Sequence, residues 1–127
     1  MKTNPKKNGV VLIVDDDPVA ISMLNLALSD AQMTVLVALS GEQAITIARR
    51  IRPDLILMDA MMPGMDGFEA CQKIKADAVI AHIPVVFMTG LSASEDMVKG
   101  FDSGGIDYVT KPIDLKALIA RIRAHLV

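Results

Sequence analysis

Short apolar segments alternate along the chain with longer segments in which apolar residues recur at helical spacing. Residues 10–14, 55–58 and 85–88 are continuously apolar, which is typical of strands buried on both faces of a parallel sheet. Residues 34–38 and 106–109 have a similar length but include polar side chains. We therefore predict five strands, with the first three segments in the centre of the sheet and the last two at its edges.

Five longer segments carry the signals of helices. In two of them, apolar residues follow the i, i+3, i+4, i+7 stripe of a helix that packs on a sheet: Ala44, Ile47, Ala48 and Ile51, and Leu115, Leu118, Ile119 and Ile122. Helix starts are marked by Asp17 before Pro18 and by the capping-box spacing of Ser40 with Gln43, Asp66 with Glu69 and Ser92 with Glu95. These signals predict helices over residues 18–30, 41–51, 67–76, 93–102 and 114–126. Gly100 interrupts the fourth helix, which we expect to be the least stable.

The strict alternation of strands and helices predicts one α/β domain with a doubly wound parallel sheet. Crossovers between parallel strands are right-handed and place helices on both faces of the sheet. The domain is expected to span residues 10–127, and residues 1–9, which lack apolar periodicity, to form a flexible leader. Ligands of such sheets bind beyond the carboxyl ends of the strands, so the chemistry is expected directly after the apolar segments.

Polar side chains follow four of the predicted strands at this edge of the sheet: Asp15, Asp16 and Asp17, then Asp59, then Thr89, and finally Lys111. Neighbouring carboxylates repel each other and resist ionisation unless a cation joins them, and oxygen ligands without His or Cys suit Mg²⁺. An ammonium and a hydroxyl beside such an ion are the groups that a transferred phosphoryl group needs. The residues therefore predict phosphoryl chemistry on a carboxylate, with Asp17 interpreted only as a helix cap.

The composition excludes several classes of protein. Thirteen Lys and Arg against fifteen Asp and Glu give a net charge of −2, which provides no field for collecting nucleic acid or anionic lipid. Aromatic residues make up 3% of the chain, too few for base-stacking platforms. The single Cys71 excludes an internal disulfide, and no apolar run approaches the ~18 residues of a membrane span. We expect a cytoplasmic protein without membrane or direct nucleic acid contacts.

Four motifs carry a resemblance to a known family. They are VLIVDDDP (11–18), LILMDAMMPGMDG (55–67), VVFMTG (85–90) and DYVTKP (107–112). In this order and on these predicted elements, they resemble the receiver domain of two-component response regulators over nearly the whole chain, from Val10 to Leu126. The resemblance implies a flavodoxin-like fold with five parallel strands in the order 2-1-3-4-5 and five helices.

The resemblance also implies roles for the acidic residues. Asp59 would accept a phosphoryl group from a histidine of a partner histidine kinase or histidine phosphotransfer protein. Asp16, Asp59 and the backbone carbonyl of Met61 would bind Mg²⁺, and Asp15 would reach the ion through water. The chain would then be a regulatory domain, not an enzyme, because it would catalyse only its own phosphorylation and dephosphorylation.

Three further positions are assigned by the same resemblance. Thr89 and Lys111 would contact the phosphoryl oxygens, and the bond between Lys111 and Pro112 would be cis. Tyr108 stands at the position of the family's aromatic switch residue. Phosphorylation adds about −1.5 to −2 charges, which we expect to pull Thr89 inward and to let the ring of Tyr108 become buried.

The signal is expected to leave through the surface formed by residues 93–102, 106–109 and 114–126. Helix 93–102 is the weakest of the predicted helices and thus the one most easily shifted between two packings. This surface would recruit a second receiver or an output domain, and it includes Glu95, Lys99, Tyr108 and Lys116. Ile113 stands where the family frequently has phenylalanine, which makes the signalling surface less defined than the site.

Three other functions compete with a phosphorylation switch. A Mg²⁺-dependent phosphatase can also use an aspartyl nucleophile, but that class usually carries a second acid two residues on and a cap domain, whereas Asp59 stands alone after the third strand. Nucleotide or flavin binding is disfavoured because neither glycine-rich phosphate motif occurs. The complete acidic set argues against a structural receiver without chemistry.

The remaining polar and sulfur side chains are interpreted as structural. We expect His82 and His125 at the surface. The basic residues of the last helix should lie on its solvated face and complement its dipole: Lys116, Arg121 and Arg123. Cys71 lies in helix 67–76 and is predicted to pack in the core.

Overall fold

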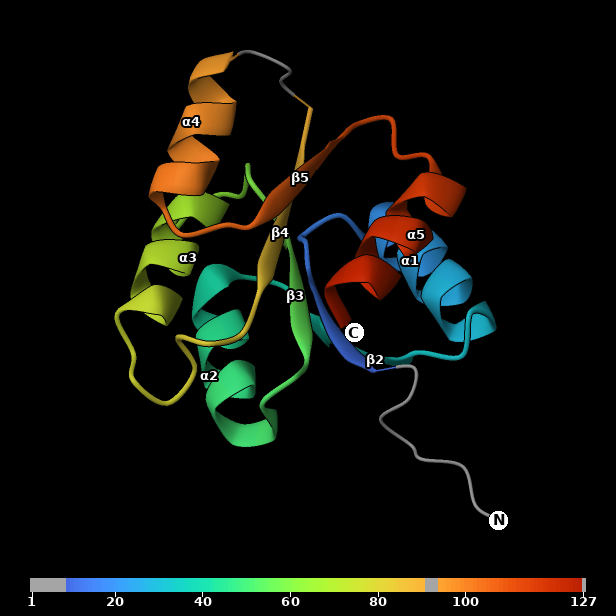
Figure 1. The fold of residues 1–127 in the computed structure, drawn as a ribbon, viewed down its shortest axis with the longest axis horizontal. Coiled ribbons are helices and arrows are strands. Elements are labelled where there is room, and N and C mark those ends of the chain that lie inside the picture. Colours follow the sequence, from blue (N-terminus) through green and yellow to red (C-terminus); the bar gives the residue numbers. More distant parts are fainter. Residues whose placement is uncertain (1–8, 91–93, 127) are drawn as a thin grey trace.

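The computed structural model describes residues 9–90 and 94–126 as a sheet of five parallel strands with helices on both sides (Figure 1). The strands are β1 (Val10–Val14), β2 (Thr34–Ala38), β3 (Leu55–Asp59), β4 (Val85–Thr89) and β5 (Asp107–Thr110). The helices are α1 (Pro18–Asp30), α2 (Gly41–Ile51), α3 (Gly67–Lys75), α4 (Ser94–Asp102) and α5 (Leu115–Leu126). The predicted leader lies outside the described residues except for Gly9, which is buried and whose carbonyl accepts a hydrogen bond from the Thr34 N–H (3.0 Å).

The strands pair in the order β2-β1-β3-β4-β5, as the resemblance implied, and every pairing is parallel. All residues of β3 and β4 are buried, whereas β2 and β5 are only partly buried. The predicted doubly wound α/β sheet, with β2 and β5 at its edges, is therefore confirmed. The strand order reverses between β1 and β3, and sheets of this kind bind their ligands beside such a reversal.

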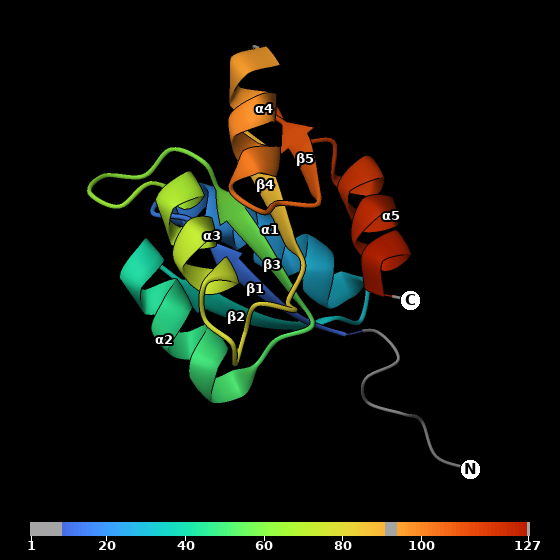
Figure 2. The same ribbon diagram turned by 60° about the vertical axis from the view of Figure 1, so that its left-hand side comes forward.

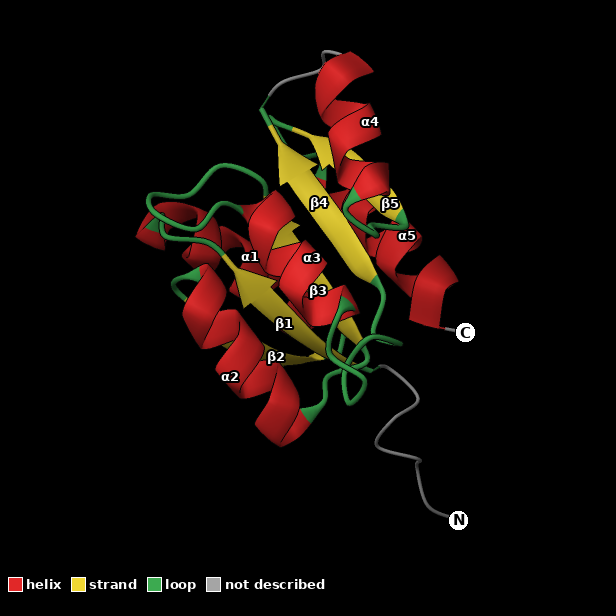
Figure 3. Cartoon of the chain, turned by 90° about the vertical axis from the view of Figure 1, so that its left-hand side faces the viewer, coloured by secondary structure: helices red, strands yellow, loops and turns green. Residues whose placement is uncertain are grey.

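Helices cover both faces of the sheet. α1 and α5 lie on one face, and α2, α3 and α4 lie on the other, an arrangement that can be followed in three views (Figures 1, 2 and 3). Along β1, Val11 and Ile13 join the core under α1 and α5, whereas Leu12 and Val14 join the core under α2 and α3. Burial on both faces explains why the central strands are continuously apolar. Within the described ranges, no helix is both long and apolar enough to cross a membrane.

The helix starts follow the predicted capping chemistry. Asp17 caps α1 by accepting from the Val19 N–H (3.0 Å), and Asp66 forms a complete, reciprocal capping box with Glu69 at the start of α3. Ser40 accepts from the Gln43 N–H (3.1 Å). The Gln43 side chain, however, accepts from the N–H of Leu39 (2.8 Å) and not from Ser40. The box predicted at Ser92 and Glu95 involves residue 92 and a side chain that lie outside the described residues.

Two of the strands run one residue further than predicted. β3 includes Asp59 and β4 includes Thr89, because Asp59 pairs with Met88 and Thr89 pairs with Thr110. β5 correspondingly begins and ends one residue later than the apolar pattern suggests. Asp59 and Thr89 are thus the last residues of two neighbouring strands, and the sheet itself holds their backbone in place.

Candidate functional site

Three strands bring charged side chains together at one edge of the sheet. Asp15 follows β1, Asp59 ends β3, and Lys111 follows β5. The backbone N–H of Lys111 donates to the carbonyl of Thr89 (2.8 Å), which ties the segment after β5 to the end of β4. The peptide bond between Lys111 and Pro112 is cis, as the resemblance implied.

Asp15, Asp16 and Asp59 form a cluster of carboxylates, and two of the three are buried. Asp15 is 1% exposed and Asp59 is 3% exposed, whereas Asp16 is exposed. One ligand atom from each of the three lies within 4.8 Å of the others. Asp15 Oδ1 accepts from the Asp17 N–H (3.0 Å). Asp15 Oδ2 is the one buried side-chain nitrogen or oxygen without a hydrogen-bond partner in the described part of the chain.

The carboxylate of Asp59 has two donors on the same oxygen. Oδ1 accepts from the ammonium of Lys111 (3.2 Å) and from the N–H of Met61 (3.3 Å). The pKa of Asp59 rises from 3.8 to about 6, chiefly because the carboxyl is buried and secondly because of the neighbouring charge of Asp15. The Lys111 ammonium and the Met61 N–H lower it without cancelling this rise. Three carboxylates and one ammonium meet here, so the site carries more negative charge than its own residues neutralise.

These residues fit a hard divalent cation. The donor set consists of three carboxylates with neither His nor Cys among them, which is the chemistry preferred by Mg²⁺. A buried carboxylate oxygen without a partner is costly unless a ligand satisfies it. The orphaned Oδ2 of Asp15 is thus the observation in the protein that calls for a cation at this position.

The loop after β3 is shaped by close backbone packing. A Cβ on Gly67 would overlap the backbone carbonyl of Asp59, so the start of α3 can lie against the end of β3 only with glycine there. Gly64 has a φ of 75°, a conformation that favours glycine. Met61, whose N–H donates to Asp59, is 59% exposed.

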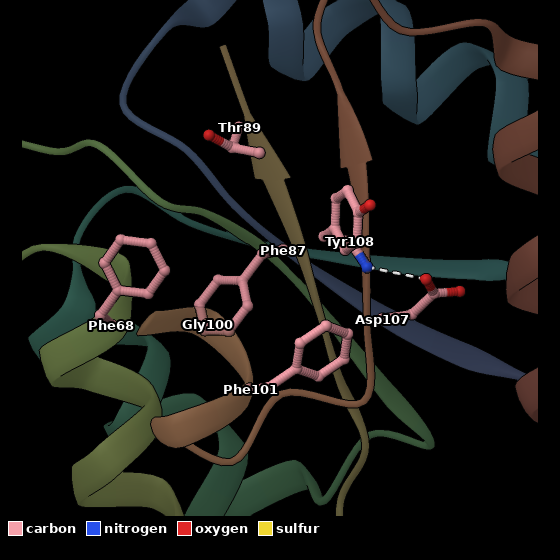
Figure 4. Close-up of a pocket in the computed structure, with 7 residues that line it drawn as sticks. All are labelled: Phe68, Phe87, Thr89, Gly100, Phe101, Asp107 and Tyr108. Carbon is pink, nitrogen blue, oxygen red and sulfur yellow. Dashed lines mark hydrogen bonds between the residues drawn. The ribbon is translucent and has the colours of Figure 1, made fainter. Parts of the chain in front are cut away.

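Thr89 and Tyr108 line a common cavity on the side of the sheet that carries α4 (Figure 4). All the aromatic residues of the chain surround it: Phe68, Phe87, Phe101 and Tyr108. Phe101 and Tyr108 meet edge to face, with ring centroids 6.0 Å apart and an interplanar angle of 85°. The cavity measures about 10 Å³, roughly the space of one water molecule. A tyrosine ring cannot enter it unless a neighbour moves.

A family model for the response regulator receiver domain matches residues 11–123. The chain belongs to this family. As receiver domains are regulatory, membership favours a regulatory role over the phosphatase alternative.

Individual relatives support the assignment. RpaA of Synechocystis sp., a DNA-binding dual master transcriptional regulator, is 41% identical over 116 residues, which cover 91% of this chain and 48% of that protein. The response regulator PleD of Caulobacter vibrioides is 44% identical over 114 residues, or 90% of this chain and 25% of PleD. The receiver domain of the sensor histidine kinase PA1611 from Pseudomonas aeruginosa, solved with a magnesium ion in its active site cleft, matches with a TM-score of 0.86 and 28% identity over 93% of this chain and 97% of that one. The chain spans a quarter to a half of the length of these curated relatives.

The receiver domain also contains a charged cluster that the sequence pattern does not predict. Arg121 Nη1 donates to both carboxylate oxygens of Asp107 (2.9 Å each), and His125 Nε2 lies 3.1 Å from Asp107 Oδ2. Burial alone would raise the pKa of Asp107, but hydrogen bonds from His125, the Tyr108 N–H and Arg121 lower it overall. Arg121 and His125 are therefore engaged with β5 instead of facing only solvent. Their separations of 14 and 18 residues leave no local pattern by which the sequence could reveal them.

Proposed function

We propose that this receiver domain is a phosphorylation switch in which Asp59 accepts a phosphoryl group from a histidine of a histidine kinase or a histidine phosphotransfer protein. One observation carries the proposal: the buried carboxylate of Asp59 lies 3.2 Å from the ammonium of Lys111 and beside an unpartnered carboxylate oxygen of Asp15. Phosphoryl transfer to a carboxylate requires a nucleophile, a countercharge and an oxygen that can bind a metal ion. Asp59, Lys111 and Asp15 provide these three groups.

In the proposed reaction, a carboxylate oxygen of Asp59 attacks the phosphorus of the donor's phosphohistidine. The new O–P bond forms as the N–P bond breaks, and the electron pair returns to the imidazole ring. Lys111, which pairs with Asp59 before the reaction, pairs with the phosphoryl oxygens afterwards, because these carry about −1.5 to −2 charges. The hydroxyl of Thr89, at the end of the neighbouring strand, donates to the same oxygens.

The acidic cluster would hold Mg²⁺. Asp16, Asp59 and the backbone carbonyl of Met61 would bind it directly, and Asp15 would reach it through water. When bound, Mg²⁺ supplies positive charge that offsets the carboxylates and the developing phosphoryl charge. The magnesium ion in the active site cleft of the PA1611 receiver supports this assignment.

Phosphorylation of isolated protein tests the acceptor. With Mg²⁺ and acetyl phosphate, intact mass spectrometry should detect one added phosphoryl group that is lost in acid. Asp59→Asn should accept none, since an amide is a poor nucleophile. Lys111→Ala should lose much of the conformational response even where the group is added. A stable phosphoryl group on Ser, Thr or His instead would overturn the mechanism.

The signal would leave through α4, β5 and α5. Thr89 and Tyr108 line the same small cavity, so a Thr89 that turns toward the phosphoryl group makes room on the side of Tyr108. Nearby apolar side chains are exposed: Val98 and Phe101 on α4 are 57% and 49% exposed, and Ile106 is 41% exposed. Such a patch suits a protein partner, which we propose is a second receiver or an output domain. The relative RpaA is a DNA-binding regulator. If the protein described here also contacts DNA, the contact would come from an output domain and not from the receiver.

Hydrogen exchange can test this route. Beryllofluoride, which mimics the phosphoryl group, should change protection in α4, β5 and the region of Tyr108. α1 and α2 serve as internal references and should change little. If the changes concentrate in α1 or α2 while α4 and Tyr108 stay the same, the proposed output surface is wrong even when Asp59 is the acceptor.

A further inference from the structure

A groove opens beside the carboxylate site, between α1 and the segment that joins β5 to α5. Its volume is about 270 Å³, and both Asp15 and Lys111 line it. Lys111 Nζ lies 3.2 Å from Asp59 Oδ1, and Asp15 belongs to the same acidic cluster as Asp59. A molecule in this groove is therefore in reach of the atoms that receive the phosphoryl group.

Away from Asp15, Lys111 and Asp17, which also lines it, the wall of the groove is largely apolar. α1 contributes Ala20 and Met23, β4 contributes Met88, and the segment after β5 contributes Ile113 and Leu115. A cavity of about 150 Å³ with such a lining binds benzene, so this groove has room for a hydrocarbon group of similar or larger size. The leaving group of acetyl phosphate is acetate, whose single methyl group would leave most of this apolar groove unfilled.

Resting on the proposed phosphorylation of Asp59, we propose that the groove binds the apolar acyl group of small acyl phosphates. It would make a donor with a longer acyl chain, such as butyryl phosphate, a better substrate than acetyl phosphate. The phosphoryl end of the donor would lie at Asp59 and Lys111, and the hydrocarbon end would lie against Ala20 and Met23.

The reaction balances without a further reactant. A carboxylate oxygen of Asp59 forms a bond to phosphorus, and the bond between phosphorus and the acyl oxygen breaks. The electron pair leaves with that oxygen, so the products are aspartyl phosphate and a free carboxylate such as butyrate. No proton is transferred, nothing is oxidised or reduced, and acetate and butyrate are leaving groups of nearly equal basicity. A difference in rate between the two donors thus reports on binding of the hydrocarbon.

The size of the effect follows from the burial that the groove offers. A fully buried CH₂ group would raise the rate constant roughly fourfold. The groove is partly open, since Met23 is 51% exposed and Val19, also in its lining, is 66% exposed. About half of the full effect gives roughly twofold per CH₂, so butyryl phosphate, with two more CH₂ groups, should react about fourfold faster than acetyl phosphate.

The test compares second-order rate constants for phosphorylation of the full chain by acetyl, propionyl and butyryl phosphate with Mg²⁺. Ala20→Leu fills the groove from α1 and changes none of the acidic residues, and Met23→Gln makes its wall polar. Ala27→Leu is the matched control, because Ala27 lies on the same helix but lines a different depression, between α1 and α5.

We expect the rate constant to rise with chain length in the unaltered protein and in Ala27→Leu. Both groove variants should lose this rise while keeping the rate with acetyl phosphate, a result that also shows that they fold. Equal rate constants for the three donors, or a rise that survives in both groove variants, would overturn the groove assignment alone. Failure of every donor to modify Asp59 would instead overturn the proposed function.

Discussion

Replacing Asp59 by Asn should stabilise the metal-free protein at neutral pH. The Asp59 carboxyl titrates near 3.8 when the chain is unfolded, but its pKa is about 6 in the folded protein. Between these pH values the folded protein binds more protons than the unfolded chain, so the free energy of unfolding falls as the pH rises through this window. A rise of two pKa units corresponds to about 3 kcal/mol. Above pH ~6 the Asp59 carboxyl is ionised in the folded protein, and the free energy of unfolding is lower by this full amount. Asn removes this cost.

Urea denaturation in the presence of EDTA, from pH 4 to 7.5, measures the difference. Asp59→Asn should be more stable than the unaltered protein by about 3 kcal/mol at pH 7 and by about half of that near pH 5, and the two should converge toward pH 4. Asp17→Asn is the control, because Asp17 is exposed and Asn caps a helix as well as Asp does. It should change the stability by less than about 0.5 kcal/mol. A difference independent of pH, or an Asn variant that is less stable at pH 7, would show that the ionised Asp59 carboxylate does not destabilise the fold.

Three further outcomes follow from the site and its scaffold. Mg²⁺ at ten times its Kd should stabilise the unmodified protein by about 1.4 kcal/mol. Asp16→Asn should need more Mg²⁺ for the same rise in Tm. A Tm that does not change when millimolar Mg²⁺ is added would contradict the metal assignment. Gly67→Ala should destabilise the fold by more than about 2 kcal/mol in urea denaturation, because its Cβ would overlap the Asp59 carbonyl, whereas Gly90→Ala, whose Cβ meets nothing within 4 Å, should be nearly neutral. Asp66→Ala should cost about 1 kcal/mol through loss of the capping box, and an unchanged midpoint in urea would show that the cap contributes nothing.

The strands and the location of the site could be predicted because they depend on simple rules. Segments buried on both faces have to be continuously apolar, which made β1, β3 and β4 visible in the sequence. Parallel strands end at the same edge of the sheet, so residues as far apart as Asp15, Asp59 and Lys111 could be expected to meet. The strand order itself came from the family resemblance and not from the apolar pattern.

Contacts between layers could not be predicted, since no local spacing records them. The pairing of Arg121 and His125 with Asp107 depends on how α5 crosses the edge strand. The orphaned oxygen of Asp15 arises only when the end of β1 is fully buried. The need for glycine at position 67 likewise becomes apparent only when α3 packs against the end of β3.

Chemical mapping can identify which aspartate receives the phosphoryl group, which we propose is Asp59. The most direct measurement treats the protein with acetyl phosphate and Mg²⁺, reduces the acyl phosphate with borohydride, and maps the product by peptide mass spectrometry. Reduction converts a phosphorylated aspartate to homoserine, so we expect homoserine at position 59 and aspartate at positions 15 and 16. Homoserine at position 15 or 16, or an unmodified residue 59 in protein that carries the phosphoryl group, would contradict it.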